Sequence, residues 1–254
     1  MKKIHLLMLF FFCIATSFKQ TNDAKLTMAV AANMQYAFDA LRTDYIAYKG
    51  VAVNSIIGSS GKLTQQITEG APFDIFISAD TKYPQTLYQS KLTSDTPKIY
   101  ANGVLVLWST KDGIKPTADL KLLLADNIKA IAIANPKTAP YGVAAEEILK
   151  NYNLFDKVQP KIVYGESITQ TSQYIATGAA DIGFTAKAIV LSDEMKGKGS
   201  WVELDGTRYS PISQAAVITK YGQQNHQKDA EDFYNYLYSA RAKKILVQFG
   251  YLVK

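Results

Sequence analysis

The sequence LTMAVAANMQYAFDALRTDYIAYKGVAVNSIIG, residues 26–58, joins two short apolar runs through a longer stretch of mixed residues. The apolar runs, residues 26–32 and 51–57, have the length and aliphatic content of buried strands. Between them, apolar side chains recur at helical spacing over residues 34–48. A strand, a helix and a second strand in this order are typical of parallel strands joined by a crossover helix. This segment therefore predicts an α/β fold whose sheets are mostly parallel.

The same alternation continues to the end of the chain. Further strands are predicted at residues 73–78, 104–108, 130–134, 162–164, 182–185, 201–204 and 215–219, and further helices at residues 61–69, 141–151, 168–177, 229–238 and 240–249. Asp80 is placed to cap a helix after the third strand, and Gly250 is placed to end the last helix. No linker rich in Pro, Gly or Ser divides the chain. Two lobes would therefore be joined by extended strands, for which residues 100–108 and 201–217 are the candidates.

The N-terminus has the pattern of an export signal. Lys2 and Lys3 precede an apolar run at residues 6–15, and polar residues follow from position 19. This pattern predicts a signal peptide over residues 1–19 and a periplasmic mature protein that begins between residues 18 and 25. The apolar run has about half the ~20 residues that a membrane-spanning helix needs, so a permanent anchor is the less favoured alternative.

Composition restricts the partners and cofactors. The formal net charge is +6, and without Lys2 and Lys3 it is +4, with charges of both signs interspersed. The densest basic stretch, residues 241–244, is interpreted as the solvated face of a helix, so no nucleic-acid partner is expected. The only cysteine, Cys13, lies in the signal, which leaves the mature chain without a disulfide or thiolate ligand. We expect no metal site and no cofactor.

Catalytic reagents are scarce in this sequence. Of its two histidines, only His226 would survive processing, and its polar surroundings predict an exposed side chain without a function. The sequence GSSGK at residues 58–62 lacks the spacing of a phosphate-binding loop. An enzyme is therefore not expected. The alternative is a hydrolase that uses Ser60 as nucleophile and Lys62 as base.

Hydrogen-bond donors recur instead at the turns between strands and helices. Asn33 ends the first strand and is placed to cap the next helix, and Ser59 and Ser60 open the helix after the second strand. Two later turns, NPKTAPYG at residues 135–142 and GESIT at residues 165–169, have the same position between a strand and a helix.

Such helix starts can bind an anion together. Each has backbone N–H groups without an intrahelical acceptor and the positive end of the helix dipole. Turns of this kind lie beyond the carboxyl ends of the strands, where ligands bind in open α/β sheets. Starts that converge from two lobes would coordinate an anion without a countercharge. The alternative is that Asn33, Ser60 and Ser167 only cap their helices.

Several stretches resemble the molybdate-binding proteins of bacterial ABC uptake systems. They are AVAAN at residues 29–33, GSSGKL at 58–63, EGAPFDIFISAD at 69–80, IANPKTAPYG at 133–142 and FGY at 249–251. The resemblance covers essentially the whole mature chain. It implies a two-lobed type II periplasmic-binding-protein fold, in which each lobe is a mixed sheet flanked by helices and the ligand lies in the cleft. Lobe I would comprise residues 20–101 and 206–254, and lobe II residues 102–205.

The resemblance also implies the ligand-binding residues. Asn33 and Ser60 would serve the anion from one lobe, and the backbone N–H groups of Tyr141 and Ile168 from the other. Many members of the family have a serine in place of Asn33 and a tyrosine in place of Ala186. We interpret the Asn33 and Tyr141 side chains as a compensating arrangement.

The function implied is the substrate-binding component of an uptake system, a monomer that delivers molybdate, and also tungstate, to an ABC permease in the inner membrane. A shell made only of donors should reject phosphate, because an anion that keeps a proton would leave it unpaired at a cost of about 1–3 kcal/mol. Sulfate would have to be excluded by the size of the cavity. The alternatives are a binding protein for sulfate, thiosulfate or a phosphonate, and a sensory domain of a regulator.

Overall fold

The structure, a computed structural model, describes residues 26–253. The predicted signal peptide, the start of the mature chain and Cys13 lie outside the described residues. Among the residues described, no helix is long and apolar enough to cross a membrane.

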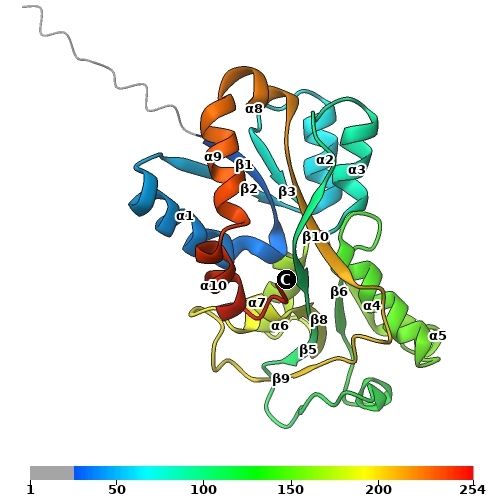
Figure 1. Cartoon of the computed structure of the whole chain (residues 1–254). Helices are drawn as coiled ribbons and strands as arrows, with labels where there is room; N and C mark the ends of the chain where they lie inside the picture. The colour runs from blue at the N-terminus through cyan, green and yellow to red at the C-terminus, as the bar shows by residue number, and fades with distance from the viewer. Residues whose placement is uncertain (1–25, 254) are drawn as a thin grey trace, which may run out of the picture.

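Two five-stranded sheets form two lobes (Figure 1). The first sheet has the order β2-β1-β3-β10-β4 and the second the order β7-β6-β8-β5-β9. The strands of the first sheet are β1 (Leu26–Ala31), β2 (Val53–Gly58), β3 (Ile75–Ile77), β4 (Lys98–Gly103) and β10 (Ile212–Ile218). Those of the second are β5 (Leu105–Ser109), β6 (Ile131–Ala134), β7 (Ile162–Gly165), β8 (Ile182–Ala186) and β9 (Ser200–Glu203).

Both sheets are mixed. In the first, β1 is parallel to β2 and β3, whereas β10 is antiparallel to β3 and β4. In the second, β6 is parallel to β7 and β8, whereas β5 is antiparallel to β8 and β9. The two-lobed α/β fold with mixed sheets is confirmed, but the expectation of mostly parallel sheets is wrong. β5 and β10 each enter from the other lobe instead of following a crossover helix, and both run against their neighbours.

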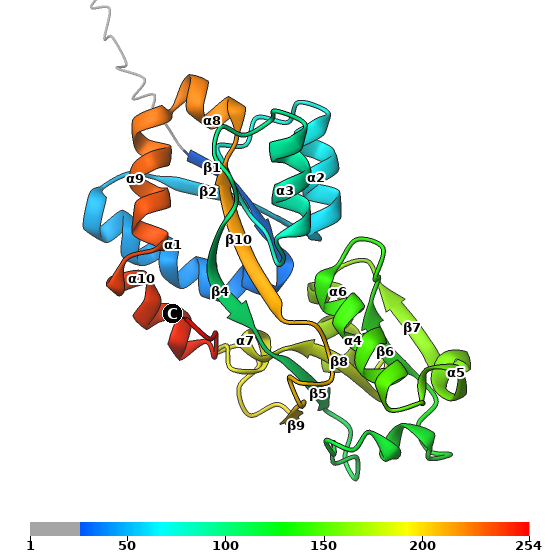
Figure 2. The ribbon, with the colours of Figure 1, turned by 45° about the vertical axis from the view of Figure 1, so that its right-hand side comes forward.

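Helices cover the faces of both sheets (Figure 2). Around the first sheet lie α1 (Gln35–Lys49), α2 (Ser60–Thr68), α3 (Lys82–Gln89), α8 (Lys220–Asn225), α9 (Gln227–Leu237) and α10 (Ala240–Gln248). The second sheet is accompanied by α4 (Pro140–Asn151), α5 (Phe155–Val158), α6 (Ile168–Ala176) and α7 (Lys187–Val190). Short 3-10 turns occur at η1 (Ala32–Met34), η2 (Lys121–Leu124) and η3 (Gln159–Lys161).

The inner strand β1 is apolar over residues 28–31 because both of its faces are buried there. Met28 and Val30 pack in the same cluster as Phe38 of α1, and Ala29 packs in another cluster with Leu63 of α2. Successive side chains of a strand point to opposite faces, so a strand covered on both faces needs apolar residues at every position. These two clusters fix α1 and α2 relative to the carboxyl end of β1.

The chain passes between the lobes in two extended segments. Only Val104 separates β4 from β5, and residues 204–211 connect β9 to β10. Both lie within the stretches predicted to cross between lobes. Figure 2 shows β4 and β10 side by side, running toward the second lobe, so the lobes are joined through neighbouring strands.

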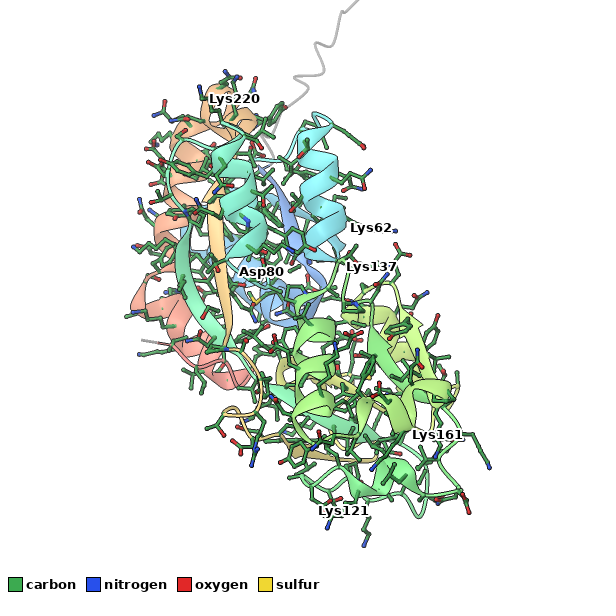
Figure 3. All side chains as sticks on the ribbon, turned by 90° about the vertical axis from the view of Figure 1, so that its right-hand side faces the viewer. Lys62, Asp80, Lys121, Lys137, Lys161 and Lys220 are labelled. Carbon is green, nitrogen blue, oxygen red and sulfur yellow. The ribbon has the colours of Figure 1, made fainter. Side chains whose placement is uncertain are left out.

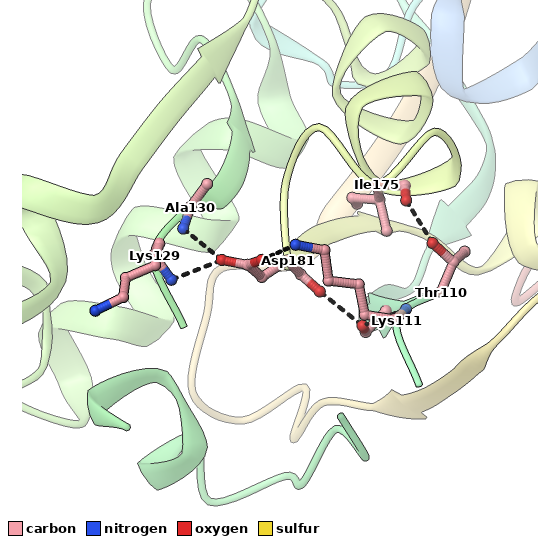
Figure 4. A network of polar contacts seen from close by, with 7 residues as sticks. Thr110, Lys111, Lys129, Ala130, Ile175 and Asp181 are labelled. Atoms are coloured by element: carbon pink, nitrogen blue, oxygen red, sulfur yellow. Dashed lines mark hydrogen bonds and ion pairs between the residues drawn. The ribbon is translucent and has the colours of Figure 1, made fainter. Parts of the chain in front are cut away.

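Buried carboxylates secure each lobe internally. In the second lobe, Asp181 accepts hydrogen bonds from the backbone N–H groups of Lys129 (2.6 Å) and Ala130 (2.8 Å) and pairs with Lys111 (Figure 4). These contacts tie the start of β6 to the start of β8.

In the first lobe, Asp74 accepts from the Thr27 N–H at 2.6 Å and lies 2.7 Å from the His226 Nδ1. The expectation of an exposed His226 is wrong, because its side chain is only 26% exposed and is paired with Asp74, which is 152 residues away.

Candidate functional site

A small pocket lies between the lobes and is lined by residues of both. The cavity is small, about 10 Å³ in volume, far below the ~300–1,000 Å³ typical of sites for drug-sized ligands. Its lining consists of Ala31, Ala32, Asn33, Ser59, Ser60, Ala79, Ala139, Pro140, Tyr141 and Ile168. All four residues predicted to bind the ligand are thus brought together. None of the ten is charged, so the pocket suits a small ligand recognised by neutral groups.

Three helices begin at this pocket. Ser60 is the first residue of α2, Pro140 of α4 and Ile168 of α6. The N–H groups of the first turn of an α-helix have no intrahelical acceptor, and the helix dipole adds positive potential there. Pro140 has no N–H, which suits the first position of α4 and leaves the N–H of Tyr141 to serve the pocket. Donors from two lobes therefore converge on one small space.

Asn33 does not cap α1, contrary to the prediction. The turn η1 comes between β1 and α1 and places Asn33 within a helical turn rather than at a cap position. Its Nδ2 donates to the Oε1 of Gln214 (2.9 Å) and to the hydroxyl of Tyr251 (3.0 Å). Its Oδ1 is buried and has no partner among the described residues.

The two serines at the start of α2 have different roles. Ser60 Oγ accepts a hydrogen bond from the Ala79 N–H (3.0 Å), so the hydroxyl keeps its own proton for a further acceptor. Ser59 stands at the cap position but its Oγ makes no capping bond, and this buried oxygen has no partner in the described part of the chain. By contrast, Ser167 caps α6 as predicted, since its side chain accepts from the Gln170 N–H at 3.3 Å.

Unpartnered buried oxygens cluster at this pocket. Within the described residues there are four such side-chain atoms, and three of them belong to Asn33, Ser59 and Thr138, the last being the neighbour of Ala139 in the pocket wall. Buried polar groups are nearly always hydrogen-bonded, so a concentration of exceptions in one pocket indicates a place built for a polar ligand. Ser59 was not among the residues predicted to bind the ligand, although its position beside Ser60 at the end of a strand was a usable signal.

A buried polar cluster lies against the pocket and extends to the segments that join the lobes. At its centre, Gln214 of β10 donates through Nε2 to the Tyr141 hydroxyl (3.2 Å) and accepts from the Tyr100 hydroxyl (2.7 Å). The Tyr251 hydroxyl donates to the backbone oxygen of Asn33 (3.0 Å). Burial raises the pKa of Tyr100, Tyr141 and Tyr251 well above the ordinary value of 10.0, so the three hydroxyls are neutral.

The interpretation of the Tyr141 side chain as a compensating ligand stays a prediction, because its hydroxyl accepts from Gln214 and keeps its own proton. Its hydroxyl is bonded to Gln214 and lies so close to Gly103, the last residue of β4, that a side chain there would collide with it. Ala186 is the last residue of β8, is fully buried and is not part of the pocket lining. Helix starts and serines offer donors to the pocket, and the bond between Tyr141 and Gln214 also connects one lobe to the other.

Direct contacts hold the lobes together around the pocket. The Gly61 N–H donates to the Thr138 oxygen (3.0 Å), and the Tyr83 hydroxyl donates to the Lys137 oxygen (3.0 Å). Lys62 of α2 also forms an ion pair with Glu166. In Figure 3, Lys62 and Lys137 lie at the junction of the two lobes. These contacts describe a closed arrangement in which both lobes face the same space.

Acidic groups are sparse near the pocket. Asp80 follows the lining residue Ala79, and its Oδ1 accepts hydrogen bonds from Ser78 Oγ (3.0 Å) and the Tyr83 N–H (3.2 Å). Burial raises the pKa of the Asp80 carboxyl. Over the described residues, no group of three or more His, Cys, Asp and Glu side chains could hold a metal ion.

Two mixed α/β lobes, joined by two extended segments and enclosing a small pocket, define a two-lobed solute-binding protein. The chain belongs to the bacterial extracellular solute-binding protein family, whose model matches residues 26–252. It is 36% identical to the molybdate-binding protein of Azotobacter vinelandii over 230 residues, or 90% of each chain. It is 34% identical to that of Rhodobacter capsulatus over 227 residues, covering 89% of this chain and 87% of that one.

The solved structure of the A. vinelandii periplasmic molybdate-binding protein matches with a TM-score of 0.85 and 35% identity, over 90% of this chain and 99% of that one. A sulfate-binding protein from Mycobacterium tuberculosis matches with a TM-score of 0.75 at 16% identity, over 89% of this chain and 86% of that one, which shows a shared fold alone. The resemblance to molybdate-binding proteins predicted from the sequence is thus confirmed.

Proposed function

We propose that this chain is the substrate-binding component of an ABC uptake system and that it captures molybdate. The observation that carries the proposal is the uncharged pocket between the lobes, where three helix starts and the unpartnered hydroxyl of Ser59 meet. The similarity to molybdate-binding proteins over most of the chain supports the choice of anion.

The chemistry of the lining favours a fully ionised tetrahedral anion. Backbone N–H and hydroxyl groups can donate to every oxygen of such an anion, and no carboxylate lines the pocket to accept a proton from it. Phosphate keeps a proton at neutral pH, and leaving that proton unpaired costs about 1–3 kcal/mol, or roughly one to two decades of affinity. Tungstate has nearly the same size and charge as molybdate and should bind as well.

Closure of the lobes would accompany capture. Asn33 and Ser60 belong to the first lobe, whereas Tyr141 and Ile168 belong to the second, so the anion satisfies both sets only when the lobes approach. A closed form stabilised by the ligand is a surface that a membrane permease can recognise. The protein would therefore act in the periplasm, as a monomer, with an ABC permease as its partner.

Binding is favoured over hydrolysis by the surroundings of Ser60. Lys62, the base that a hydrolase would need, is paired with Glu166. Ser60 Oγ accepts from a backbone N–H, and within residues 26–253 it has no histidine as a hydrogen-bond partner. These contacts support a non-catalytic role, and the proposal includes no cofactor.

Titration calorimetry with molybdate, tungstate, sulfate and phosphate tests the proposal. We expect heat and tight binding with molybdate and tungstate, and an affinity for phosphate that is lower by roughly one to two decades. Tight sulfate binding without molybdate heat would transfer the function to a different anion. Turnover of generic ester substrates that is lost in Ser60→Ala would instead support the hydrolase.

A further inference from the structure

We propose that Gln214 is a positioning residue that sets the orientation of the Asn33 carboxamide, and that in the anion-bound protein both amides are turned together relative to the arrangement described above. This inference rests on the proposed function, because it requires an oxyanion in the pocket.

The present orientation of Asn33 leaves it without a proton for the ligand. Both Nδ2 protons are used by Gln214 and Tyr251, and the atom without a partner is the acceptor Oδ1. Asn33 is 1% exposed and lines the pocket. A carbonyl oxygen repels an anion, whereas an amide NH₂ in the same position would donate to it.

Turning the Asn33 amide alone does not solve this problem. A half-turn exchanges Nδ2 and Oδ1, which places the NH₂ where no protein acceptor competes for it. It also sets Oδ1 against the Oε1 of Gln214, across a distance of 2.9 Å. Two buried acceptors in contact would lose a hydrogen bond and repel each other, so Gln214 prevents the turn unless it turns as well.

Turning both amides keeps the bonds of Gln214 paired and leaves one conflict, at Tyr251. The single proton of the Tyr251 hydroxyl can go either to the Asn33 backbone oxygen (3.0 Å), as in the arrangement described above, or to the turned Oδ1. The new bond from the Asn33 NH₂ to the anion offsets this one lost pair. The Nε2 of Gln214 then donates to Asn33 Oδ1, and its Oε1 faces the Tyr141 hydroxyl, which changes from acceptor to donor. The Tyr100 hydroxyl accepts from Gln214 and keeps its bond to the Ser78 oxygen (3.2 Å). Hydroxyl groups can exchange these roles without moving, because each is both donor and acceptor.

The coupled turn links the pocket to both lobes. Gln214 is fully buried in β10 of the first sheet, whereas Tyr141 belongs to α4 of the second lobe and lines the pocket near the start of that helix. The bond between them joins the lobes beside the anion. Gln214 thus acts on the ligand through Asn33 and not by contact, since it is not part of the pocket lining.

A double-mutant cycle tests the role of Gln214. Molybdate affinity is measured by calorimetry for the wild type, Gln214→Met, Asn33→Ser and the double variant. We expect Gln214→Met to weaken binding roughly tenfold to a hundredfold, the loss of one hydrogen bond to a charged group. In the Asn33→Ser background, where no carboxamide needs orienting, the same change should cost less than about threefold. Equal losses in both backgrounds would overturn the inference.

A second measurement applies even where Gln214→Met does not fold. In the ¹⁵N-labelled wild type, molybdate should shift the side-chain NH₂ resonances of Asn33 and Gln214 together. A shift of Asn33 with Gln214 unmoved would contradict a coupled turn. A wild type that binds no molybdate overturns the proposed function itself, whereas binding without coupling between the two amides overturns only this inference.

Discussion

Removal of the Ser60 hydroxyl should weaken anion binding strongly while leaving the fold intact. Ser60 Oγ is buried at the start of α2, accepts from the Ala79 N–H and keeps one proton for the ligand. A hydrogen bond to a charged group is worth about 1.5–3 kcal/mol, and about 1.4 kcal/mol corresponds to tenfold in affinity. Ser60→Ala should therefore weaken molybdate binding roughly tenfold to a hundredfold.

The same substitution should also lower stability, by a separate route. The Ala79 N–H loses its acceptor, which costs about 1–3 kcal/mol when the group is buried. Calorimetry measures the affinity, and urea denaturation without the anion measures the stability. The two effects can then be compared in one protein.

Thr64→Val is the matched control for this experiment. Thr64 lies in the same helix, is buried, and its hydroxyl bonds the Ser60 oxygen at 2.8 Å, but it is not part of the pocket lining. The control should lower stability with little change in affinity. If Ser60→Ala binds molybdate within about twofold of the wild type, or if the control loses as much affinity, the assignment of Ser60 as a ligand-binding residue is refuted.

Three further predictions concern closure and stability. Glu166→Gln removes the ion pair between Lys62, which is 51% exposed, and Glu166, which is 52% exposed. Because exposed ion pairs contribute about 0–1 kcal/mol, the affinity for molybdate should fall less than about fivefold. Calorimetry at high salt should show a smaller difference between the variant and the wild type. Gly61→Ala would place a Cβ 3.0 Å from Thr138 Cα and 2.8 Å from the Tyr83 hydroxyl. Small-angle scattering with molybdate should therefore show incomplete closure of the lobes, while the melting temperature without the anion stays unchanged. Normal closure of this variant would contradict a close contact between Gly61 and Thr138 in the closed protein. The buried hydroxyls of Tyr100, Tyr141 and Tyr251 have a raised pKa in the folded protein, so the unfolded chain releases these protons first. Their contribution to the free energy of unfolding should be constant below the ordinary tyrosine pKa of 10.0 and should fall as the pH rises above it. Denaturant titrations from neutral to alkaline pH should show this fall with a smaller slope in Tyr251→Phe, and an unchanged slope would argue against the raised pKa of Tyr251.

Much of the fold was predictable because the inner strands of both sheets are buried on both faces. Met28 and Val30 pack on one face of β1 and Ala29 packs on the other. The resulting apolar run identifies the strand from the sequence alone, without knowledge of the strands that pair with it. The strand β4 was not predicted as a separate element, since Lys98 and Ile99 at its start are exposed and it forms the edge of the sheet. Helix α3 was indicated only by Asp80, whose carboxylate does accept from the first turn of that helix.

The pocket was predictable only where its residues follow the local pattern of a strand ending before a helix. Asn33, Ser60, Tyr141 and Ile168 all have that position. Gln214 and Tyr251 do not, because they reach Asn33 from 181 and 218 residues away, and tertiary packing alone brings them together. Gln214 did have a signal, since a glutamine inside the apolar strand ISQAAVI must find buried partners.

Co-crystallisation with molybdate and location of the metal by anomalous scattering would test the central claim most directly. The account predicts one tetrahedral anion in the pocket, with its oxygens within hydrogen-bond distance of Asn33, Ser60, Tyr141 and Ile168 and with no charged side chain in contact. Molybdenum bound elsewhere, or an anion held by Lys62 after the ion pair with Glu166 has opened, would contradict it.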